Sequence, residues 1–427
     1  MRGALAMLLA GGEGSRLLTL SRHRAKPAVP FGGIYRIIDF TLSCIMRSNI
    51  PFVGIMTQYR PYSLMDHVSN GEAWGFVGRR RLAKVLPPYV GGKNSDWYAG
   101  TADAVYQNLS FIERFPQAEL VMVLSGDHVY SMDYREVIEK HLSSNAELTI
   151  ACQEVPWEET RQFGIMVTGE NDRIIGFVEK PKDNPPSNLA SLGIYVFQRK
   201  ALIDRLRADA ARHDSQHDFG QNIIPSMIDE GKTFAYRFKG YWRDVGTVDS
   251  YWRAHMDILA PDSQLNLCKW QVQTNPASFG EGNLFPARVD PPGKAVDSIL
   301  GLGSVIGGTV MHSVLSPGVR VQEGAVVRNS VILHDTVISR GVQIDNVVID
   351  KNVLIGEGAV IGEGDDMPNK DMPDKLFTGL TLIGKRAEIP AHARIGRNVL
   401  VESSMMSQDF PPNGEVPSGG TVKREGR

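Results

Sequence analysis

The stretch Leu9-Ala10-Gly11-Gly12-Glu13-Gly14-Ser15-Arg16-Leu17 decides the fold of the first part of the chain. It follows the apolar run 4–9, which predicts a glycine loop at the end of a first β-strand. Glycines let the backbone pass close to a ligand, and exposed amides there hold a phosphate or a base edge. Arg16, and Lys26 ten residues further on, supply cations for phosphate oxygens. The spacing fits neither a Walker loop nor the dinucleotide fingerprint.

Short apolar runs alternate with helical patterns over residues 1–260, which predicts an α/β domain with a Rossmann-like, mostly parallel mixed sheet. Helical spacing of apolar residues after Thr101 predicts a helix that Thr101 caps. The expected strands are residues 4–9, 52–57, 120–125 and 148–151.

The second half has a period of six. Small and branched apolar residues recur at this step, and glycines crowd the turns between them, which predicts a left-handed parallel β-helix of hexapeptide repeats over residues 301–427. A β-sandwich with accidental spacing is the alternative. The residues that keep the step are Val319, Ala325, Val331, Val337, Val353, Ala359, Ile383, Ile389, Ile395 and Val401.

Three segments break these patterns. Residues 261–300 contain many prolines and are predicted to be a linker between the two domains. Residues 365–377, polar with two prolines, are expected to loop out of one coil of the β-helix. The end of the chain, residues 407–427, is rich in glycine, proline and charge, which favours a mobile tail.

Composition narrows the class of protein. A formal net charge of −2 over 427 residues gives no basis for binding nucleic acid or a membrane surface, and no apolar run is long enough to span a membrane. The three cysteines, Cys44, Cys152 and Cys268, are far apart and lack metal spacing, which favours free thiols in a reducing cytosol. The first residues resemble no signal peptide, so a cytoplasmic protein is predicted.

Two aspartates are the candidate metal ligands. Asp127 follows the predicted strand 120–125, at the strand end where α/β sheets bind ligands. Asp244 lies in the short run Arg243-Asp244-Val245-Gly246. Carboxylates are the usual ligands of Mg²⁺, which neutralises reacting phosphates. His128 is expected to be structural, and the pair His213 and His217 lacks a third metal ligand.

The glycine loop followed by Lys26-Pro27 resembles the nucleotide-binding signature of the sugar-nucleotide pyrophosphorylases. Four further segments resemble the bacterial ADP-glucose pyrophosphorylase branch of that family, and the hexapeptide domain matches it too. The order of the segments along the chain is also that of the family. The four segments are residues 31–40, 97–104, 217–220 and 241–247.

The resemblance implies an activity and a set of residues. It implies that ATP and glucose 1-phosphate give ADP-glucose and diphosphate for glycogen synthesis, with Arg16, Lys26, Asp127 and Asp244 as catalytic residues and Mg²⁺ on the two aspartates. The implied contacts of glucose 1-phosphate are Tyr98, Gly164, Glu179, Lys180 and Ser191. The implied contacts of the nucleotide are Leu9, Ala10, Gly11, Gly12, Gly14, Ser15, Arg16, Gln58, Gly100, Thr101 and Ala102.

The resemblance also implies a homotetramer that small metabolites regulate through a basic cleft. Candidate effector residues are Arg22, His23, Arg24, Lys26, Arg36 and Arg386. Relatives activated by sugar phosphates often have a lysine where this chain has His23, and Arg or Gln where it has Ala99, so the sequence leaves the effector open.

Three other functions stay open at this point. The chain could make UDP-, dTDP- or GDP-sugars, or it could be a non-catalytic regulatory subunit of the same family. Such subunits usually lose the metal aspartate or the sugar lysine, and both are present here. An acyltransferase on the β-helix would need a catalytic histidine, and His312, His334 and His392 lack a recognisable context.

Overall fold

The computed structural model describes residues 3–78, 80–88, 97–229, 231–279 and 285–424. The chain forms two compact units. The first, here called the sheet unit, comprises Met1–Gly12 and Ile38–Trp242. The second, here called the β-helix unit, comprises Glu13–Ile37 and Arg243–Arg427. None of the helices in the described part of the chain has the length and apolar character that a membrane crossing needs.

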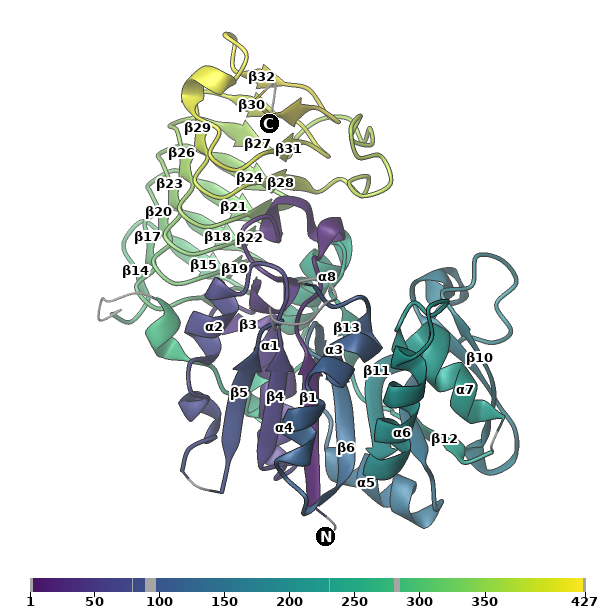
Figure 1. Cartoon of the computed structure of the whole chain (residues 1–427). Helices are drawn as coiled ribbons and strands as arrows, with labels where there is room; N and C mark the ends of the chain where they lie inside the picture. Colours follow the sequence, from purple (N-terminus) through teal and green to yellow (C-terminus); the bar gives the residue numbers. More distant parts are fainter. Residues whose placement is uncertain (1–2, 79, 89–96, 230, 280–284, 425–427) are drawn as a thin grey trace. The chain divides into compact units, whose positions relative to one another are not determined.

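The sheet unit is built on a nine-stranded mixed sheet (Figure 1). Its strands are β1 (Gly3–Leu9), β4 (Phe52–Met56), β5 (Leu82–Leu86), β6 (Ala118–Ser125), β8 (Leu148–Glu154), β9 (Gly164–Thr168), β10 (Ile174–Glu179), β11 (Leu189–Gln198) and β12 (Thr233–Arg237). The order is β10-β9-β11-β6-β1-β4-β5, with β8 beside β11 and β12 beside β8. The β6, β1, β4 and β5 strands are parallel, whereas β11 is antiparallel to β6 and β8. The predicted α/β fold is therefore confirmed.

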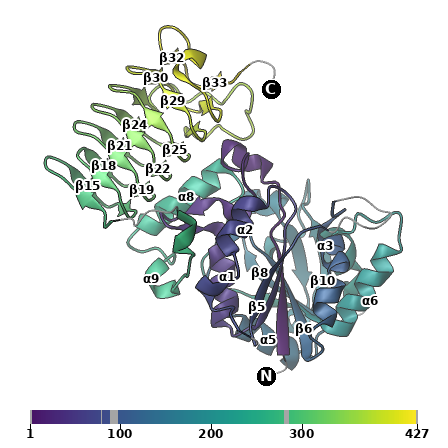
Figure 2. The same ribbon diagram turned by 60° about the vertical axis from the view of Figure 1, so that its left-hand side comes forward.

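Helices cover both faces of this sheet (Figure 2). The main ones are α1 (Ile37–Arg47), α2 (Tyr62–Val68), α3 (Thr101–Gln107), α4 (Leu109–Glu113), α5 (Tyr134–Ser143), α6 (Arg199–Ala210) and α7 (Ile224–Ile228). The shorter elements are η3 (Glu72–Trp74), β7 (His128–Tyr130), η4 (Trp157–Gln162), η5 (Glu170–Asp172) and η6 (Phe219–Ile223). Buried residues of α3, α4 and α6 share one apolar core with Leu5, Val121 and Ile150 of the strands. His141 of α5 bonds Thr149, whose side chain alternates to the opposite face.

The helix predicted after Thr101 is present, but Thr101 does not cap it. The cap position is Gly100, and Thr101 is the first helical residue. The Thr101 hydroxyl instead donates to Asp218 Oδ2 (2.8 Å) and accepts from Phe219 N (3.0 Å). It is therefore bound to the start of η6, which spacing along the chain could not reveal.

The β-helix unit stacks short strands into three parallel sheets (Figure 2). One sheet holds β14 (Arg288–Val289), β17 (Val305–Ile306), β20 (Arg320–Val321), β23 (Val337–Ile338), β26 (Leu354–Ile355) and β29 (Glu388–Ile389). The next holds β15 (Lys294–Val296), β18 (Thr309–Met311), β21 (Val326–Arg328), β24 (Gln343–Asp345), β27 (Val360–Ile361), β30 (Arg394–Ile395) and β32 (Glu415–Val416). The third holds β16 (Ile299–Leu300), β19 (Val314–Leu315), β22 (Val331–Ile332), β25 (Val347–Ile349), β28 (Thr381–Ile383), β31 (Leu400–Val401) and β33 (Thr421–Val422). Each sheet supplies buried side chains to one core, as the six-residue period predicts.

In the middle of this unit, each coil has one side that is one residue shorter than the six-residue repeat predicts. Val321 pairs with Ile338, which is a step of 17 residues, whereas Ile383 pairs with Val401, a step of 18. One side of the shorter coils therefore has five residues. As a result Ile332 and Ile338 enter the core, and the predicted Val331 and Val337 lie one position before them.

Two segment boundaries differ from the prediction. Strands β14, β15 and β16 lie within the predicted linker 261–300, so the β-helix begins near residue 288 instead of 301. This first coil has a neighbour on one side only and is largely exposed, which weakens its apolar pattern. The predicted mobile tail is wrong over its described part, since β32 and β33 pair with β30 and β31. Residues 425–427 lie outside the described residues.

The segment 365–377 does leave the coils, as predicted, and joins β27 to β28. The buried side chain of Asn369 is one of its anchors. Asn369 Nδ2 donates to the carbonyl oxygens of Asn398 (3.0 Å) and Gly420 (2.9 Å). The loop is thus tied to the last coils of the β-helix.

Residues 13–37 and 243–260, predicted to belong to the first domain, pack with the β-helix. They form η1 (Ser15–Leu20), η2 (Lys26–Ala28), β2 (Pro30–Phe31), β3 (Tyr35–Arg36) and α8 (Val248–Leu259), and are followed by α9 (Leu267–Trp270) and η7 (Pro276–Phe279). The Tyr251 hydroxyl donates to Pro30 O (2.7 Å), and Gly32 N donates to His255 Nε2 (3.1 Å). Trp252 Nε1 donates to Asn329 O of the β-helix (2.7 Å). Strand β13 (Trp242–Asp244) spans the boundary between units, and η8 (Ser407–Asp409) precedes the last coil.

Candidate active site

The first half of the glycine loop lies where three parallel strands end. Ala10 N donates to Met56 O (2.9 Å) and Gly126 N to Leu9 O (3.0 Å), which ties the ends of β1, β4 and β6 together. A Cβ on Gly11 would lie only 3.1 Å from the Cβ of Gln58. The structure therefore brings together Leu9, Ala10, Gly11 and Gln58, four of the residues predicted to contact the nucleotide.

A second part of the predicted nucleotide set is held by the segment 216–220. A Cβ on Gly100 would lie 2.3 Å from His217 O, so only glycine fits there. Ala102 N donates to the same carbonyl (2.8 Å). Gly100, Thr101 and Ala102 are thus fixed against a segment more than a hundred residues away in sequence.

Asp127 lies two residues after the end of β6 and is accessible, with 27% of its side chain exposed. Ser125 Oγ donates to Asp127 Oδ1, and His128 Nε2 lies 3.4 Å from the same oxygen. Gly193 of β11 has a left-handed backbone, and a Cβ there would press on Ser125 at 3.1 Å. The carboxylate is therefore oriented by its own loop at the carboxyl end of the sheet.

Of the predicted sugar-phosphate residues, Gly164 and Lys180 lie against the Glu179 carboxylate. A Cβ on Gly164 would lie 2.8 Å from Glu179 Oε2, and one on Gly220 would lie 2.4 Å from it. Lys180 Nζ lies 3.2 Å from Glu179 Oε1. Burial raises the pKa of Glu179, and the Lys180 charge opposes that shift.

Ser191 and Tyr98 have different surroundings. Ser191 Oγ donates to the Tyr195 hydroxyl (3.4 Å), and burial raises the pKa of Tyr195 above its usual range. The charges of Glu179 and Asp218 raise the same pKa, so Ser191 belongs to the Glu179 group. Tyr98 is instead bound at the end of β5, where its hydroxyl donates to Leu86 O (3.2 Å) and accepts from Asn108.

Four residues of this site carried no role in the sequence analysis. Asp218 caps η6 by accepting from Gly220 N (2.8 Å) and Gln221 N (3.1 Å). Trp242 packs edge-on against His128 (5.0 Å between ring centroids) and Phe163 (5.3 Å). The rings of Tyr195 and Phe219 lie 5.9 Å apart at a tilt of 30° in the large apolar core of the sheet unit. The segments 217–220 and 241–247 stood out in the sequence, but only the fold places these side chains.

The β-helix unit holds the predicted catalytic residues Arg16, Lys26 and Asp244. Lys26 Nζ lies 2.5 Å from Asp244 Oδ1, and Arg16 Nη2 lies 3.6 Å from Asp244 Oδ2. A Cβ on Gly246 would lie 2.8 Å from Arg16 Nη2 and 2.9 Å from both carboxylate oxygens. Arg16, Lys26 and Asp244 are therefore brought together, and Gly246 leaves room for them.

The second half of the glycine loop also lies in this unit. Gly14 has a left-handed backbone (φ 68°), and its carbonyl accepts from Ser21 Oγ (2.7 Å). Ser15 begins η1, and its carbonyl accepts from Lys375 (3.4 Å). A Cβ on Gly12, the last residue of the sheet unit in this loop, would meet nothing within 4 Å. Asp127 and Asp244 belong to different units, so their shared metal stays a prediction.

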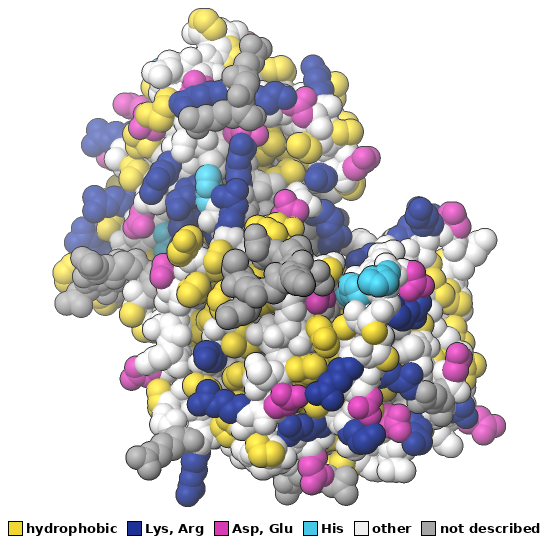
Figure 3. Space-filling model, in the orientation of Figure 1, with side chains coloured by type: hydrophobic (Ala, Val, Ile, Leu, Met, Phe, Trp, Pro, Cys, Tyr) yellow, Lys and Arg dark blue, Asp and Glu magenta, His cyan; other side chains and the backbone are white. Residues whose placement is uncertain are grey.

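Several of the candidate effector residues form a second cluster in the β-helix unit, here called the basic cluster. Arg24 Nη2 donates to both oxygens of the fully buried Asp350 (2.9 Å each), while no described group accepts from the buried Arg24 Nη1. Burial and the charges of Arg36 and Arg24 lower the pKa of Lys351 to about 7. Figure 3 shows Lys and Arg side chains gathered on the β-helix unit.

The remaining candidates lie at the edge of the basic cluster or apart from it. Burial, with the nearby charges of Arg24 and Arg386 among the causes, lowers the pKa of Lys385. Arg386 is exposed, and its backbone N–H donates to Lys351 O (3.0 Å). Arg22 is paired with Glu402 (2.6 Å), and His23 is exposed. Sequence reasoning missed Lys351, Lys385 and Asp350, because they follow β-strands with no local motif.

Comparison with known proteins agrees with this architecture. A family model described as nucleotidyl transferase matches residues 5–260, and one described as the GlmU-like C-terminal hexapeptide matches residues 283–378. The site and the fold thus define a nucleotidyltransferase followed by a left-handed parallel β-helix.

Curated relatives narrow the class further. The chain is 49% identical over 415 residues to a glucose-1-phosphate adenylyltransferase of Thermotoga neapolitana, with 96% of each chain covered. It is 47% identical over 423 residues to that of Pseudothermotoga lettingae (98% of each) and 42% identical over 412 residues to that of Acetivibrio thermocellus (95% of each). The chain belongs to the nucleotidyl transferase family and, within it, to the glucose-1-phosphate adenylyltransferases.

Proposed function

We propose that this chain transfers the adenylyl group of ATP to glucose 1-phosphate, giving ADP-glucose and diphosphate. The observation that carries the proposal is the 42–49% identity, over nearly the whole chain, to relatives named for this reaction. The clustering of the predicted residues supports it. Leu9, Ala10, Gly11 and Gln58 would receive the nucleotide, and Gly164, Glu179, Lys180 and Ser191 the sugar phosphate.

Two carboxylates would hold Mg²⁺. Asp127 is accessible and oriented by its own loop, and carboxylate oxygens suit this hard cation. Trp242 packs against His128, the neighbour of Asp127, and Asp244 follows Trp242 by two residues. A chain segment of two residues spans at most about 7 Å, so the backbone of Asp244 lies within that distance of Trp242. This connectivity supports the proposal that Asp127 and Asp244 bind the same ion. When bound, Mg²⁺ would neutralise charge on the reacting phosphates.

The proposed chemistry is a direct in-line displacement at the α-phosphorus of ATP. An oxygen of the glucose 1-phosphate phosphate forms the new P–O bond, and the bond to diphosphate breaks. The attacking oxygen is already ionised at neutral pH, so no general base is needed, and His128 keeps a positioning role. Arg16 and Lys26 would stabilise the charge on the triphosphate, since guanidinium and ammonium groups are strong donors to phosphate.

The sugar end depends on a rigid backbone around Glu179. Gly164 and Gly220 let the carboxylate lie directly on the backbone of β9 and η6, where it would accept from sugar hydroxyls. Lys180, 63% exposed, is free to reach toward the phosphate of glucose 1-phosphate. This division of labour places the two substrates for reaction without a covalent intermediate.

The basic cluster is the proposed site of metabolite control. Arg24 is paired with the buried Asp350, and the charges of Arg24 and Arg36 both lower the pKa of Lys351, so positive charge is crowded in this cluster. An anionic effector would relieve this repulsion and accept from Arg24 Nη1. The resemblance also implies a homotetramer, which sedimentation of the purified chain would test.

The deciding experiment measures diphosphate release by the purified chain with glucose 1-phosphate and each of ATP, UTP, dTTP and GTP. The proposal requires a rate with ATP at least about tenfold above the others. A preference for another nucleotide would favour a different sugar-nucleotide product. Activity with none of the four would favour a regulatory subunit. A repeat across a panel of glycolytic metabolites would identify the effector.

A further inference from the structure

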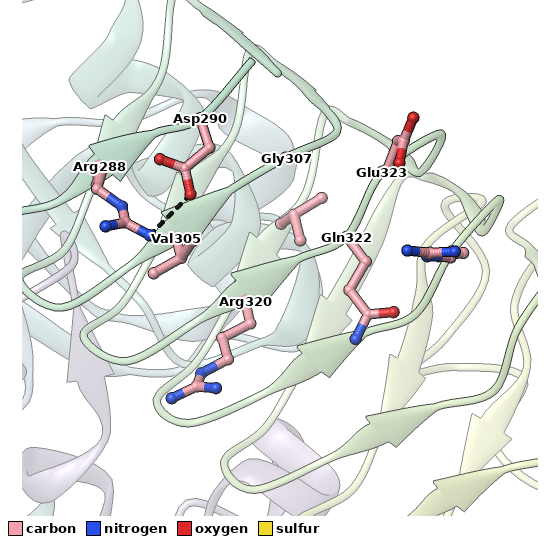
Figure 4. Close-up of a pocket in the computed structure, with 9 residues that line it drawn as sticks. Arg288, Asp290, Val305, Gly307, Arg320, Gln322 and Glu323 are labelled. Atoms are coloured by element: carbon pink, nitrogen blue, oxygen red, sulfur yellow. Dashed lines mark hydrogen bonds and ion pairs between the residues drawn. The ribbon is translucent and has the colours of Figure 1, made fainter. Parts of the chain in front are cut away.

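The outer surface of the β-helix has a polar hollow that the proposed reaction does not use. It has a volume of about 530 Å³, which falls within the range of small-molecule sites. Its walls come from the sheet β14-β17-β20, the corners that follow these strands, and the corner after β23 that carries Arg340 (Figure 4). The lining residues are Arg288, Asp290, Val305, Gly307, Arg320, Val321, Gln322, Glu323 and Arg340.

Three arginines surround this hollow, and they are not equivalent. Arg288 Nη2 donates to Asp290 Oδ2 (2.9 Å), so this pair forms a neutral wall. Arg320 and Arg340 have no ion pair within 4.0 Å among the described residues. Val305 lies between Arg288 and Arg320 in the sheet and is paired with both. The two arginines are therefore two strands apart, each step being about 5 Å.

The remaining acid does not neutralise the pocket. Gly341 N donates to Glu323 O (3.3 Å), which places Arg340 in the coil next to Glu323. In Figure 4 the Glu323 carboxylate lies at the opposite side of the hollow from the Arg320 guanidinium. Arg320 is therefore a free donor, and the Gln322 amide adds a further donor and acceptor on the same wall.

We propose that this hollow binds a small metabolite carrying a phosphate or carboxylate group, with Arg320 and Arg340 as the anion-binding residues. Guanidinium groups bind both kinds of oxyanion through paired hydrogen bonds. Val305 and Val321 add apolar surface beside the charged side chains, which suits a small metabolite with a short carbon skeleton next to its anionic group. The site is separate from the basic cluster, whose residues do not line the hollow. It does not rest on the proposed reaction.

A large side chain introduced at Gly307 would fill the hollow without removing any charged residue. A Cβ on Gly307 would find its nearest atoms at 3.5 Å, which is ordinary contact, and its backbone is not left-handed. The variant G307F should therefore fold and occupy the space. The variant R320Q/R340Q removes the charges instead. R328Q, an exposed arginine of β21 outside the hollow, is the matched control.

The test is calorimetric titration of the full-length chain with inorganic phosphate, glycerol 3-phosphate, citrate and uncharged glucose at 0.15 M salt. We expect R320Q/R340Q and G307F each to lose the same single binding event per chain, or to weaken it at least tenfold. R328Q should keep it, and basal ADP-glucose synthesis should not change in any variant. The phosphate and citrate arms distinguish a phosphate ligand from a carboxylate one.

Three results would overturn the proposal. Wild-type isotherms in R320Q/R340Q would exclude the arginines. Loss in R320Q/R340Q and R328Q alike, with G307F unchanged, would show diffuse surface charge in place of a pocket. A change of assembly state in R320Q/R340Q with unchanged titration would mark this face as a contact between copies of the chain.

Discussion

Lys26 and Asp244 form a buried ion pair, with 2.5 Å between Lys26 Nζ and Asp244 Oδ1 and side chains only 5% and 9% exposed. In so little solvent each charge needs compensation, and Arg16, 3.6 Å from Asp244 Oδ2, adds a second positive charge beside the same carboxylate. The lysine therefore orients a carboxylate that the proposed reaction needs for metal binding. The same contact has both a structural and a catalytic consequence, and the two are separable.

The first prediction separates them by a double-mutant cycle. K26M and D244L should each lower the free energy of unfolding by about 3–5 kcal/mol, because a buried charge loses its partner. The double variant should recover most of that loss and yet stay inactive, since both the phosphate donor and the metal ligand are gone. Urea unfolding and diphosphate release measure the two effects. Additive losses of stability would contradict the pairing.

The second prediction concerns the metal role of Asp127. D127N keeps the size of the side chain and its contact with Ser125 Oγ, so the melting temperature should hardly change. Turnover should fall by about two to three orders of magnitude, since a metal at phosphate is worth several kcal/mol. D133N, at the cap of α5, is a matched control in the same unit. Near-normal turnover of D127N would remove this residue from the metal site.

The third prediction tests the glycine support of Glu179. G164A would place a Cβ 2.3 Å from Phe177 Cζ and 2.8 Å from Glu179 Oε2, so the carboxylate must move. We expect a KM for glucose 1-phosphate raised at least about tenfold, with the KM for ATP unchanged. G176A, on the neighbouring strand β10, would have its nearest atom at 3.6 Å from the new Cβ and should behave as wild type. K180A should raise the same KM, and an unchanged value would exclude Lys180 from the sugar site.

The sequence predicts the architecture of both domains, but it does not predict where the β-helix begins or how the chain ends. The spacing of hydrophobic residues identifies both the α/β domain and the β-helix, because buried positions recur at a fixed interval along each strand or coil. The period could not locate the first coil, which has one neighbour only, or the five-residue step before Ile332. The end of the chain was mistaken for a tail because glycine and proline also build β-helix corners. Composition alone does not distinguish these uses.

In the candidate site too, the sequence predicts local motifs but not the contacts between distant segments. Glycine motifs and acidic residues identified groups that the fold assembles within each unit, such as Arg16 with Asp244 or Gly164 with Glu179. The hydrogen bonds of Thr101 with Asp218 and Phe219 join positions far apart in sequence. So do the contacts that make residues 13–37 part of the β-helix unit. Such pairings depend on tertiary packing, which a single sequence does not encode locally.

The fourth prediction concerns the pH dependence of effector binding at the basic cluster. The pKa of Lys351 is about 7, lowered by burial and by the Arg36 and Arg24 charges, while Asp350 opposes that shift. His334 and Lys385 also lie in this cluster, and burial lowers the pKa of both. Only protonated Lys351 attracts an anion, so phosphate affinity should fall as the pH rises above 7, by up to about tenfold per unit.

Two variants check that assignment by titration with inorganic phosphate between pH 6 and 9. K351R keeps its charge throughout, so it should bind as tightly at pH 8.5 as at pH 6.5. K351Q should bind weakly at every pH. A wild-type pH profile in K351R would show that another group, such as His334, controls the affinity.

The fifth prediction uses a buried histidine that joins α8 to the hairpin of β2 and β3. His255 Nε2 accepts from Gly32 N (3.1 Å), and Nδ1–H donates to Tyr251 O (2.8 Å), so the ring is neutral in this arrangement. Protonation of Nε2 would place its N–H opposite the N–H of Gly32, and this hydrogen bond would be lost. Burial lowers the pKa of His255 to about 4, against 6.5 for an exposed histidine.

The sign of the effect follows from which state takes up the proton. Because the unfolded chain protonates near pH 6.5 and the folded one near pH 4, the stability that neutral His255 contributes is complete above pH 6.5 and is lost as the pH falls toward 4. Over that window the loss amounts to about 3 kcal/mol. H255Q offers an amide with one acceptor and one donor, so urea unfolding from pH 7.5 to 4.5 should show a flatter profile. H312Q, at a half-exposed histidine of the same unit, should keep the wild-type slope, and an equal slope in H255Q would exclude His255 as its source.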